Sequence, residues 1–387
     1  KWGLAMINTK AKYIRPLVQT LIFLFLTIII LVYRLYINGL IDIKILGIGD
    51  LNPYGGWNAL RETALGSGYV FEGISKSMAL TLALTASAII GGRFFCGWIC
   101  PVGAIQDLAS RLGGKSGKGS NPLWFKYPIL LMLLIISILG YGAKIAEFSP
   151  WRALLNLPDI NSGFFILAGV FLASIFLSRF FCRYLCPLGA AQALVGSMSI
   201  LSLKHSKNCT RCGSCLRDCP VGIRLSAGSE TISPECIRCM KCVENCAADK
   251  ENDIRLKIGN KSVSLTAYAV IMPILFAVLW LGLPQVWSGS QSSGDIVLGS
   301  LKDGTYLGEA KGFAGKIITE VYVTEGRISD IKVIKHQESK GWYEEVYMTL
   351  PREIISKQRL NVDAISGATK TSKGFIESVE DAIKKAQ

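Results

Sequence analysis

Five apolar stretches limit what this chain can fold into more than any other feature of its sequence. A helix needs about 20 mostly apolar residues to cross a hydrocarbon core of roughly 30 Å. Stretches that reach or approach this length lie at about residues 17–37, 74–95, 127–143, 163–181 and 266–287. Charged residues make up only 18% of the chain, against roughly 25% in soluble domains. We therefore expect a membrane protein with an α-helical bundle of about five transmembrane helices. Buried helices of a soluble protein are the alternative.

The charges between these stretches predict which parts face the cytoplasm. Lys and Arg outnumber Asp and Glu by 42 to 28, and the excess lies ahead of the first stretch and in the loop 93–126. Because such an excess marks cytoplasmic loops, we expect a multi-pass protein of the cytoplasmic membrane, with its N-terminus and residues 205–260 inside and residues 288–387 outside. No cleavable signal sequence is expected ahead of the first stretch. The basic residues form no dense patch, which argues against a nucleic-acid partner.

A repeat with a period of about 86 residues joins the second and fourth apolar stretches. RFFCGWICPVGAIQ at 93–106 matches RFFCRYLCPLGAAQ at 179–192. Each copy is predicted to be a two-helix unit that runs the same way through the membrane, which implies a pseudo-twofold axis along the membrane normal. The cysteine pairs of both copies are then expected at one membrane face.

Eight of the twelve cysteines form two runs of the same spacing, C-x2-C-x2-C-x3-C. The runs are Cys209, Cys212, Cys215 and Cys219, and Cys236, Cys239, Cys242 and Cys246. This is the spacing of bacterial two-cluster ferredoxins, in which the fourth cysteine of a run reaches the other cluster. We therefore predict two 4Fe-4S clusters, each held by the first three cysteines of one run and the fourth cysteine of the other. A zinc site, the alternative, does not need two complete runs of four.

The other four cysteines lie in the repeat, as Cys96/Cys100 and Cys182/Cys186, and a proline follows each pair. Residues four apart share a helix face, and proline disfavours helix at the residue before it. Each pair is therefore predicted to project from the cytoplasmic end of its span. Together the pairs supply four thiolates, enough for one metal centre in the membrane. Because the spacing does not choose the metal, an additional iron–sulfur centre is favoured, while structural zinc and free thiols or disulfides stay open.

Two further residue types bear on the cofactors. The histidines, His205 and His336, lie outside the apolar stretches, which excludes a membrane b-type haem with two histidine ligands. Arg93 and Arg179 open the two copies of the repeat. They are interpreted either as anchors at the cytoplasmic face or as electrostatic support for an anionic cluster or a quinone head.

A polar segment at 287–294 separates a C-terminal domain. The domain has β-rich runs at 317–323 and 328–334, then becomes helical, and contains DAISGATKTS at 363–372. A Ser/Gly/Thr turn ahead of a helix is commonly an N-cap. The same turn offers N–H donors and a positive helix end to a phosphate. The residues alone therefore indicate an α+β domain with a helix cap or an anion site.

The motif Asp363-x-x-Ser366-Gly367-Ala368-Thr369 resembles the flavinylation motif of the FMN-binding domains in the Rnf complex and the sodium-translocating NADH:quinone reductase. The resemblance implies that a flavin transferase, working outside the cytoplasm, esterifies the FMN phosphate to Thr369. It also implies that the transferase recognises Asp363 and the turn formed by Ser366, Gly367 and Ala368. An extracytoplasmic site agrees with the orientation that the charges predict.

Residues 13–246 resemble the polyferredoxin membrane proteins that serve nitrous-oxide reductase, periplasmic nitrate reductase and reductive dehalogenases. The resemblance rests on the two CxxxCP motifs and on the ferredoxin-type cysteine runs. Several of those proteins place a flavin domain first, whereas this chain places it last. The physiological partner is therefore not implied by the resemblance.

Four parts are expected along the chain. They are a transmembrane domain with the two CxxxCP repeats at 1–204, a ferredoxin domain with two 4Fe-4S clusters at 205–260, a fifth transmembrane helix and linker at 261–290, and an extracytoplasmic FMN-binding domain at 291–387. Clusters carry single electrons, and a flavin can take electrons singly and deliver them singly or in pairs. We therefore expect an electron-transfer subunit of an oxidoreductase complex, which passes electrons between cytoplasmic clusters and covalent FMN outside.

The expected partners are a cytoplasmic electron donor or acceptor protein, an extracytoplasmic redox partner and the flavin transferase. Two other functions stay open. One is a membrane quinol or quinone oxidoreductase subunit with a quinone between its helices. The other is a redox-linked maturation or regulatory protein for a partner reductase.

Overall fold

The computed structural model describes most of the chain and divides it into two compact units. The first unit comprises Lys1–Ile30 and Ala79–Leu283, and the second comprises Leu31–Met78 and Pro284–Gln387. The described residues are 3–37, 40–41, 46–47, 49–54, 56–57, 76–113, 123–139, 149–155, 162–204, 214–217, 219–223, 233–244, 255–259, 261–286, 301–338, 343–360, 362, 364–365 and 368–387.

A helix forms in each of the five apolar stretches. The helices are α1 (Gly3–Ile37), α3 (Lys76–Gly91), α6 (Lys126–Ile138), α9 (Ser162–Phe176) and α14 (Leu265–Val286). Within the described residues, two helical segments are long and apolar enough to cross a membrane: Tyr13–Tyr36 and Leu265–Val286, with mean hydropathies of 2.4 and 2.1. The other three helices, with 16, 13 and 15 residues, are shorter than the sequence predicts.

The helices α3 and α9 end early because the backbone turns at nearly the same place in both copies of the repeat. Gly92 follows α3 with φ of +68°, and Arg179 follows α9 with φ of +54°. A residue in this left-handed region cannot continue a right-handed helix. Each copy then continues with a five-residue helix and a longer helix that begins at proline. These helices are α4 (Phe94–Trp98) and α5 (Pro101–Gly113) in the first copy, and α10 (Phe180–Tyr184) and α11 (Pro187–Gly196) in the second.

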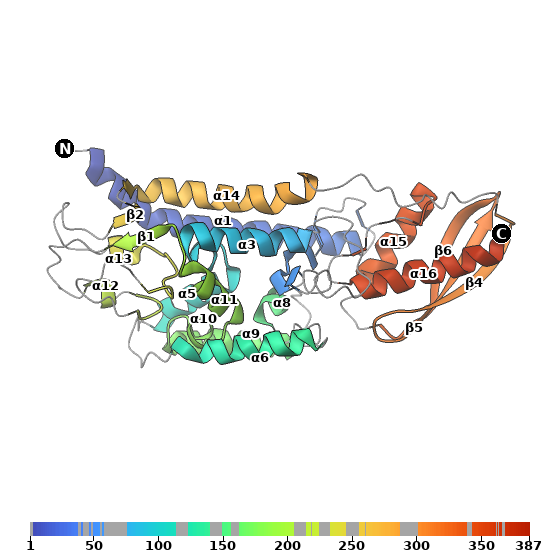
Figure 1. The fold of residues 1–387 in the computed structure, drawn as a ribbon, viewed down its shortest axis with the longest axis horizontal. Coiled ribbons are helices and arrows are strands. Elements are labelled where there is room, and N and C mark those ends of the chain that lie inside the picture. Colours follow the sequence, from blue (N-terminus) through green and yellow to red (C-terminus); the bar gives the residue numbers. More distant parts are fainter. Residues whose placement is uncertain are drawn as a thin grey trace. The chain divides into compact units, whose positions relative to one another are not determined.

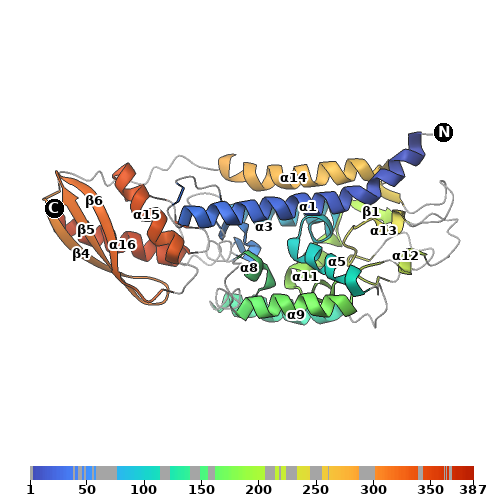
Figure 2. The ribbon, with the colours of Figure 1, turned by 180° about the vertical axis from the view of Figure 1, so that it is seen from behind.

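The two copies of the repeat pack crosswise within the first unit. Helix α5 of the first copy contacts α9 of the second, and also α8 (Pro150–Leu155). Helix α11 of the second copy contacts α6, which follows the 3₁₀ helix η2 (Leu123–Phe125). Figure 1 shows α5, α10 and α11 between α6 and α9 on one side and α1, α3 and α14 on the other, and Figure 2 shows α5 and α11 between α9 and α1 from behind. In each copy, a short helix and a longer helix follow the turn after α3 or α9, a division that the sequence did not predict.

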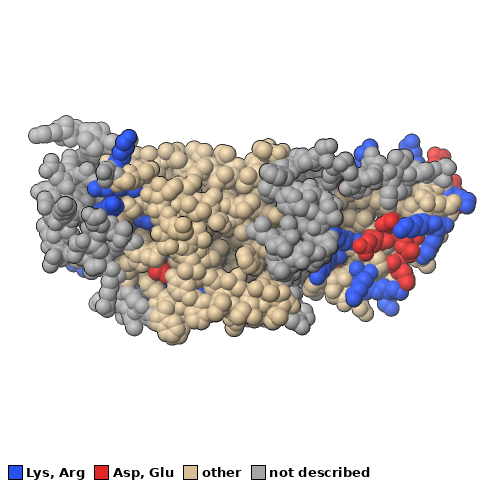
Figure 3. Space-filling model, viewed as in Figure 1, with Lys and Arg blue, Asp and Glu red and all other residues tan. Residues whose placement is uncertain are grey.

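The outward faces of four helices in the first unit carry large apolar side chains. Exposed examples are Leu17, Leu21, Phe25 and Ile28 on α1, Leu131, Met132 and Ile135 on α6, Phe165 and Leu172 on α9, and Val270, Ile271, Ile274, Val278 and Leu281 on α14. Figure 3 shows a broad surface with few charged residues over this part. Contiguous exposed apolar surface of this kind is typical of a membrane or protein contact.

A small antiparallel sheet in the first unit was not predicted from the sequence. Its strands are β1 (Leu201–Lys204), β2 (Arg255–Ile258) and β3 (Lys261–Val263), in that order. The short helices α12 (Ser214–Arg217) and α13 (Lys241–Glu244) lie between β1 and β2 in sequence. Lys204 pairs with Arg255 across β1 and β2. The sheet therefore joins the two ends of the segment that carries the eight ferredoxin-type cysteines.

The second unit contains the α+β fold expected for the C-terminal domain. The antiparallel strands β4 (Gly304–Lys311), β5 (Lys316–Thr324) and β6 (Arg327–Lys335) are neighbours in sequence order. Helix α16 (Thr369–Ala386) packs against β4 and β5, and α15 (Tyr343–Lys357) packs against β6. A 3₁₀ helix, η1 (Gly49–Leu51), also belongs to this unit. The two β-rich runs expected at 317–323 and 328–334 fall within β5 and β6.

The core of this domain lies between the sheet and the two helices. Val321, Leu350, Phe375 and Val379 are fully buried in one apolar cluster. Helix α16 lies so close to β4 that a Cβ atom on Gly308 would collide with a backbone carbonyl of the helix. This packing holds α16 against the sheet, and the predicted flavin-attachment motif ends at the first residue of this helix.

Candidate metal centres and flavin site

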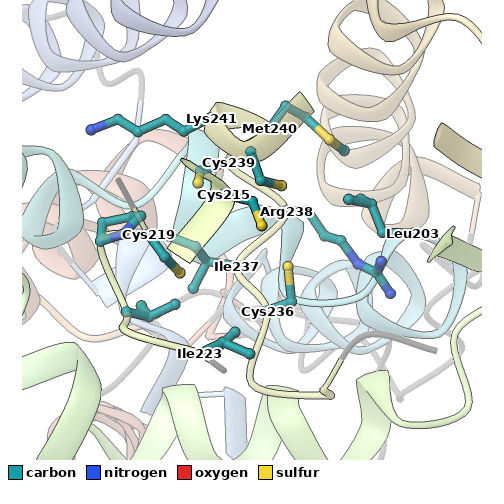
Figure 4. Close-up of a pocket in the computed structure, with 13 residues that line it drawn as sticks. Leu203, Cys215, Cys219, Ile223, Cys236, Ile237, Arg238, Cys239, Met240 and Lys241 are labelled. Atoms are coloured by element: carbon teal, nitrogen blue, oxygen red, sulfur yellow. The ribbon is translucent and has the colours of Figure 1, made fainter. Parts of the chain in front are cut away.

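Five of the ferredoxin-type cysteines surround one hollow in the first unit. The hollow is lined by Cys215, Cys219, Cys236, Cys239 and Cys242. Figure 4 shows how the loop that contains Cys236 and Cys239 faces the segments of Cys215 and Cys219. Four of these cysteines are the set predicted for one 4Fe-4S cluster, and Cys215 belongs to the predicted set of the other. Cys209, Cys212 and Cys246 lie outside the described residues.

The electrostatics of the hollow indicate what kind of group fits there. Burial, together with the neighbouring Cys239, raises the pKa of the Cys219 thiol to about 11. Burial and the thiols of Cys236 and Cys239 also raise the pKa of Cys242 well above its usual value. Buried thiols this crowded ionise only when a cation compensates their charge. An all-thiolate donor set among apolar side chains fits an iron–sulfur cluster.

Local backbone geometry turns this loop toward the hollow. Arg238 and Met240, which flank Cys239, have φ of +52° and +61°. Positive φ is uncommon in non-glycine residues and costs of order 1–3 kcal/mol. The nearby backbone N–H groups of Val221 and Ile223 partly offset the rise in the pKa of Cys219. Such N–H donors stabilise a thiolate, as expected for a cysteine that binds a metal.

The CxxxCP cysteines are not arranged along one helix, which corrects the sequence-based expectation. Cys96 lies on α4 and Cys182 on α10, but Cys100 and Cys186 follow these helices. Proline begins the next helix in each copy, so the preceding cysteine adopts a non-helical backbone. Cys186, for example, caps α11 with φ −70° and ψ 111°. The predicted effect of proline is confirmed, whereas the shared helix face is wrong.

The two CxxxCP motifs nevertheless meet across the crossed copies. The amide nitrogen of Gln106 donates to Cys182 Sγ at 3.1 Å. Reciprocally, the Cys96 thiol donates to Gln192 Oε1 at 2.9 Å. Cys100 lies within electrostatic range of the other three thiols of the two motifs. These reciprocal contacts are those expected from a pseudo-twofold axis between the copies.

Neither group of thiols has complete metal-ligand geometry. Among the residues that the structure describes, no three His, Cys, Asp or Glu side chains are already placed to hold a metal ion. In both groups the thiols lie near one another, and their roles in metal binding stay predictions.

Two buried carboxylates organise the charges around the CxxxCP motifs. Asp107 receives two hydrogen bonds from Arg179, at 2.7 and 2.6 Å, and also pairs with Arg15. Glu235 pairs with Arg93, at 2.7 Å, and with Lys126. Arg93 and Arg179 are 1% and 0% exposed. They are therefore not surface anchors, which was one of the two interpretations of these residues.

Direct contacts connect the first CxxxCP motif to the second cysteine run. Trp98 Nε1 donates to the carbonyl oxygen of Arg238 at 2.8 Å. Gly97 lies so close to Ile237 that a Cβ atom there would collide with the Ile237 carbonyl oxygen. The fully buried Ile237 shares one apolar cluster with Cys96 and Cys239. The cysteine hollow and the CxxxCP motif are thus adjacent parts of one packed region.

Sequence reasoning missed most of the residues that surround these thiols. Glu235 precedes Cys236 and gave no signal, because its partner Arg93 lies 142 residues away. Asp107 lies in the basic loop 93–126, where nothing in the sequence marks it as the partner of Arg179. Gln106 and Gln192 were visible as the last residues of the repeat, and their identity in both copies was the one signal that could have found them.

The flavin motif lies at the start of α16. Thr369 is the first residue of this helix, and Ala368 is buried immediately before it. Asp363, Ser366, Gly367 and the side chain of Thr369 lie outside the described residues. A helix N-terminus favours a phosphate through its dipole and N–H groups. The position of Thr369 therefore fits a phosphate ester.

Next to this helix start lies a group of side chains that the sequence did not reveal. Thr371 donates to the buried carboxylate of Glu338. His336 contacts the rings of Tyr343 and Tyr347, with centroids 4.3 and 5.0 Å apart. Tyr347 in turn contacts Phe375 of α16. His336, Tyr343, Tyr347 and Phe375 thus form an aromatic cluster next to the first turns of α16.

Comparison with known families assigns each of these regions to a domain type. The FMN-binding domain family matches residues 312–384. A 4Fe-4S binding domain family matches twice, at 77–119 and 162–207, once for each copy of the repeat. A 4Fe-4S dicluster domain family matches residues 202–247.

Comparison with individual proteins points the same way. The Escherichia coli protein YccM, whose name assigns it to electron transport, is 27% identical over 53% of this chain and 64% of its own length. MJ0749 of Methanocaldococcus jannaschii, an uncharacterised protein, is 32% identical over 45% of this chain and 67% of its own length. The regulatory protein NosR of Stutzerimonas stutzeri is 33% identical over 41% of this chain, but the matched part is only 24% of NosR. The chain therefore belongs to the polyferredoxin-type electron-transport proteins, and it carries 4Fe-4S binding domains and an FMN-binding domain.

Proposed function

We propose that this chain is a transmembrane electron conduit between cytoplasmic 4Fe-4S clusters and covalently bound FMN outside the cytoplasm. The observation that carries the proposal is the contact between the cysteine hollow and the first CxxxCP motif. Ile237 packs against both Cys96 and Cys239, and Trp98 hydrogen-bonds the adjacent backbone. Electron transfer requires closely spaced centres, and these contacts join the two groups of thiols in one packed region.

The membrane part of the proposal has five spans, α1, α3, α6, α9 and α14. It is supported by the exposed apolar side chains on α1, α6, α9 and α14. Helix α3 contains 16 residues, about 24 Å at 1.5 Å per residue, and the short helix α4 follows the turn at Gly92 and Arg93. With the Lys and Arg excess inside, the cysteine runs face the cytoplasm and residues 291–387 lie outside.

Each cofactor has a defined set of side chains in this proposal. The two ferredoxin-type runs hold two 4Fe-4S clusters, and Cys96, Cys100, Cys182 and Cys186 hold one further iron–sulfur centre. Thr369 carries the FMN through a phosphate ester at the start of α16. The clusters supply one-electron steps, and the flavin can exchange electrons singly or in pairs. The protein's own contribution is to exclude water and to fix the thiols with hydrogen bonds and buried charges.

The partners follow from the two exposed ends of this route. A soluble redox protein exchanges electrons with the clusters inside, another exchanges electrons with the FMN outside, and a flavin transferase attaches the FMN. A second candidate function is redox-linked maturation or regulation of a partner reductase, which is favoured by the name of NosR as a regulatory protein.

The test uses the full chain, flavinylated and reconstituted into liposomes. A membrane-impermeant reductant is added on the side of the cysteine runs, and bleaching of the flavin absorbance is followed on the other side. We expect rapid bleaching in the wild type and none in Cys239→Ala, whose cysteine lines the hollow. Ser329→Ala, on the strand β6 of the flavin domain, is the control. Equal bleaching in all three proteins, or bleaching only after a quinone is added, would contradict the conduit.

A further inference from the structure

Four residues of the repeat outside the CxxxCP motifs surround the buried thiols in a crossed arrangement. Gln106 of the first copy contacts Cys182 of the second, and Gln192 of the second copy contacts Cys96 of the first. The arginines cross in the same way. Arg179 donates to the Cys96 carbonyl oxygen at 2.7 Å, and Arg93 points to Gly189, where a Cβ atom would lie 2.6 Å from its Nη2.

Three nitrogen donors in this arrangement are buried without an acceptor. Within the part of the chain that the structure describes, Arg93 Nε, Arg93 Nη2 and Gln192 Nε2 have no hydrogen-bond partner. Arg93 is 1% exposed and Gln192 is 4% exposed. A buried donor without a partner costs about 1–3 kcal/mol, and such groups are rare in folded proteins. All three nitrogens are donors that lack an acceptor. A group that satisfies them must therefore accept hydrogen bonds.

The two copies differ in a way that directs Arg93 toward the thiols. Arg179 uses Nε and Nη2 for Asp107 and Nη1 for a carbonyl oxygen. The position of Asp107 is occupied in the second copy by Ala193, 86 residues later. At this position, the second copy therefore offers no carboxylate partner to Arg93. Its Nη1 binds Glu235. The Arg93 guanidinium is also close enough to the thiols of Cys96, Cys182 and Cys186 to interact with them electrostatically.

We propose that Gln106, Gln192 and Arg93 are hydrogen-bond donors to an anionic metal–thiolate centre held by the four CxxxCP cysteines. The inference rests on the intramembrane centre of the proposed function and adds the residues that tune it. A metal-bound cysteine sulfur only accepts hydrogen bonds. The amide oxygen and nitrogen of a glutamine exchange places when its side chain turns. When the side-chain amide of Gln192 turns over, its Nε2 donates to Cys96 in the same way that Gln106 donates to Cys182. Gln192 Nε2 then has a hydrogen-bond partner.

This assignment gives the three residues a role in the reduction potential. One-electron reduction adds one negative charge to the centre. N–H donors and a guanidinium stabilise the more negative form, so they raise the potential. Gln106, Gln192 and Arg93 are then positioning residues that act on the centre without being its ligands. Arg93 also pairs with Glu235, next to Cys236, so its charge acts on both neighbouring groups of thiols.

The test is a redox titration of the purified full chain, monitored by electron paramagnetic resonance, together with iron and sulfide analysis. Gln106→Leu and Gln192→Leu are compared with wild type and with Ser110→Ala, a control on the same helix α5 whose hydroxyl binds a backbone oxygen. We expect unchanged iron content, and for each glutamine variant a fall of about tenfold in the one-electron equilibrium constant of the CxxxCP centre, which corresponds to about 59 mV. The control and the signals of the ferredoxin-type clusters should not shift.

The outcomes separate this inference from the proposed function. If wild type contains no more iron than a variant with all four CxxxCP cysteines changed to serine, the intramembrane centre itself is wrong. If the centre is present and neither glutamine variant shifts its potential, the donor role is overturned while the centre stands. If the leucine variants lose iron, Gln106→Met and Gln192→Met keep the side-chain length. Their potentials must then fall, and an unchanged potential would overturn the proposal.

Discussion

The first unit, which contains the cysteines and is called the cysteine unit below, differs from the C-terminal domain in where its charged side chains lie. Near the CxxxCP motifs, Arg93, Arg179 and Lys126 are at most 1% exposed, and each pairs with a buried carboxylate. In the C-terminal domain the ion pairs lie on the surface, with Lys316 and Lys385 side chains 58% and 52% exposed. Figure 3 shows surface charges of both signs over the domain.

The difference shows what the buried charges are for. The C-terminal domain is held by an apolar core that includes Val321 and Phe375, so its surface ion pairs add little stability. In the cysteine unit, Asp107 binds the second copy of the repeat through Arg179, and Glu235 binds the first copy through Arg93. These pairs fix the position of three segments around the thiols. A mutation that removes the metal or the flavin from one region is therefore expected to leave the other region intact.

The largest expected effect is on the C-terminal domain alone. Thr369→Ala should abolish covalent FMN, because the phosphate ester has no other hydroxyl at the first residue of α16. The domain should stay folded and the iron content unchanged. Mass spectrometry of protein made with a flavin transferase measures the added FMN, and Thr371→Ala is the matched control. Covalent flavin that survives denaturation in Thr369→Ala would place the attachment elsewhere.

The corresponding loss in the cysteine unit should affect metal without affecting flavin. Cys96→Ser and Cys186→Ser lie in different copies but share one centre in our proposal. Each variant should lose the same iron and the same electron flux to FMN, and the double variant should be no worse, because the two residues act as one unit. Iron analysis and flavin bleaching in liposomes measure both quantities. Full iron content and unchanged flux in the single variants would reduce these cysteines to structural thiols.

A smaller effect is expected from breaking a buried pair. Asp107→Asn leaves Arg15 and Arg179 buried without a counter-charge, which should lower the free energy of unfolding by about 3–5 kcal/mol. Burial alone would raise the pKa of Asp107, but Arg179 and Arg15 outweigh burial and hold it below its usual value. Its stabilisation is therefore complete above a pH of about 4 and is lost only as the pH falls further.

Thermal unfolding of the full chain in detergent between pH 3 and pH 7 measures this effect. The Asp107→Asn protein should be less stable than wild type at neutral pH, and the difference should shrink toward pH 3. A difference that stays constant over this range would show that the Asp107 charge does not contribute.

The smallest effect should come from a surface pair of the C-terminal domain. Lys316→Ala removes the exposed ion pair with Glu309. Exposed pairs contribute about 0–1 kcal/mol, so urea unfolding followed by flavin fluorescence should hardly change its midpoint. A shift as large as that of Asp107→Asn would break the contrast between the two regions.

The sequence predicts features that depend on local patterns. The apolar stretches and the cysteine spacings each involve neighbouring residues, and the repeat is visible as two similar short motifs. Helices and two matching copies are found in these places. Pro101 and Pro187 also predict the non-helical backbone before them, because the restriction is local.

Features that depend on distant partners could not be predicted. Nothing around Arg179 indicates a positive φ, since the residue is not glycine, and this turn shortens α9. The pairing of Arg93 with Glu235 spans 142 residues. The β1–β2–β3 sheet joins segments on both sides of the cysteine runs, and the ring contact between His336 and Tyr343 depends on how α15 packs. Such contacts are set by tertiary packing and leave no local pattern.

The pairing of Lys204 with Arg255 has a consequence for how this protein family could diversify. Because these residues face each other across β1 and β2, the two ends of the segment 205–254 are held next to each other. A segment with adjacent ends behaves as an insertion, and insertions of this kind can be exchanged without moving the elements on either side. A domain that replaced this segment would therefore need ends that lie equally close, and it would also have to reproduce the contacts of Glu235, Ile237 and Arg238 with the first copy of the repeat.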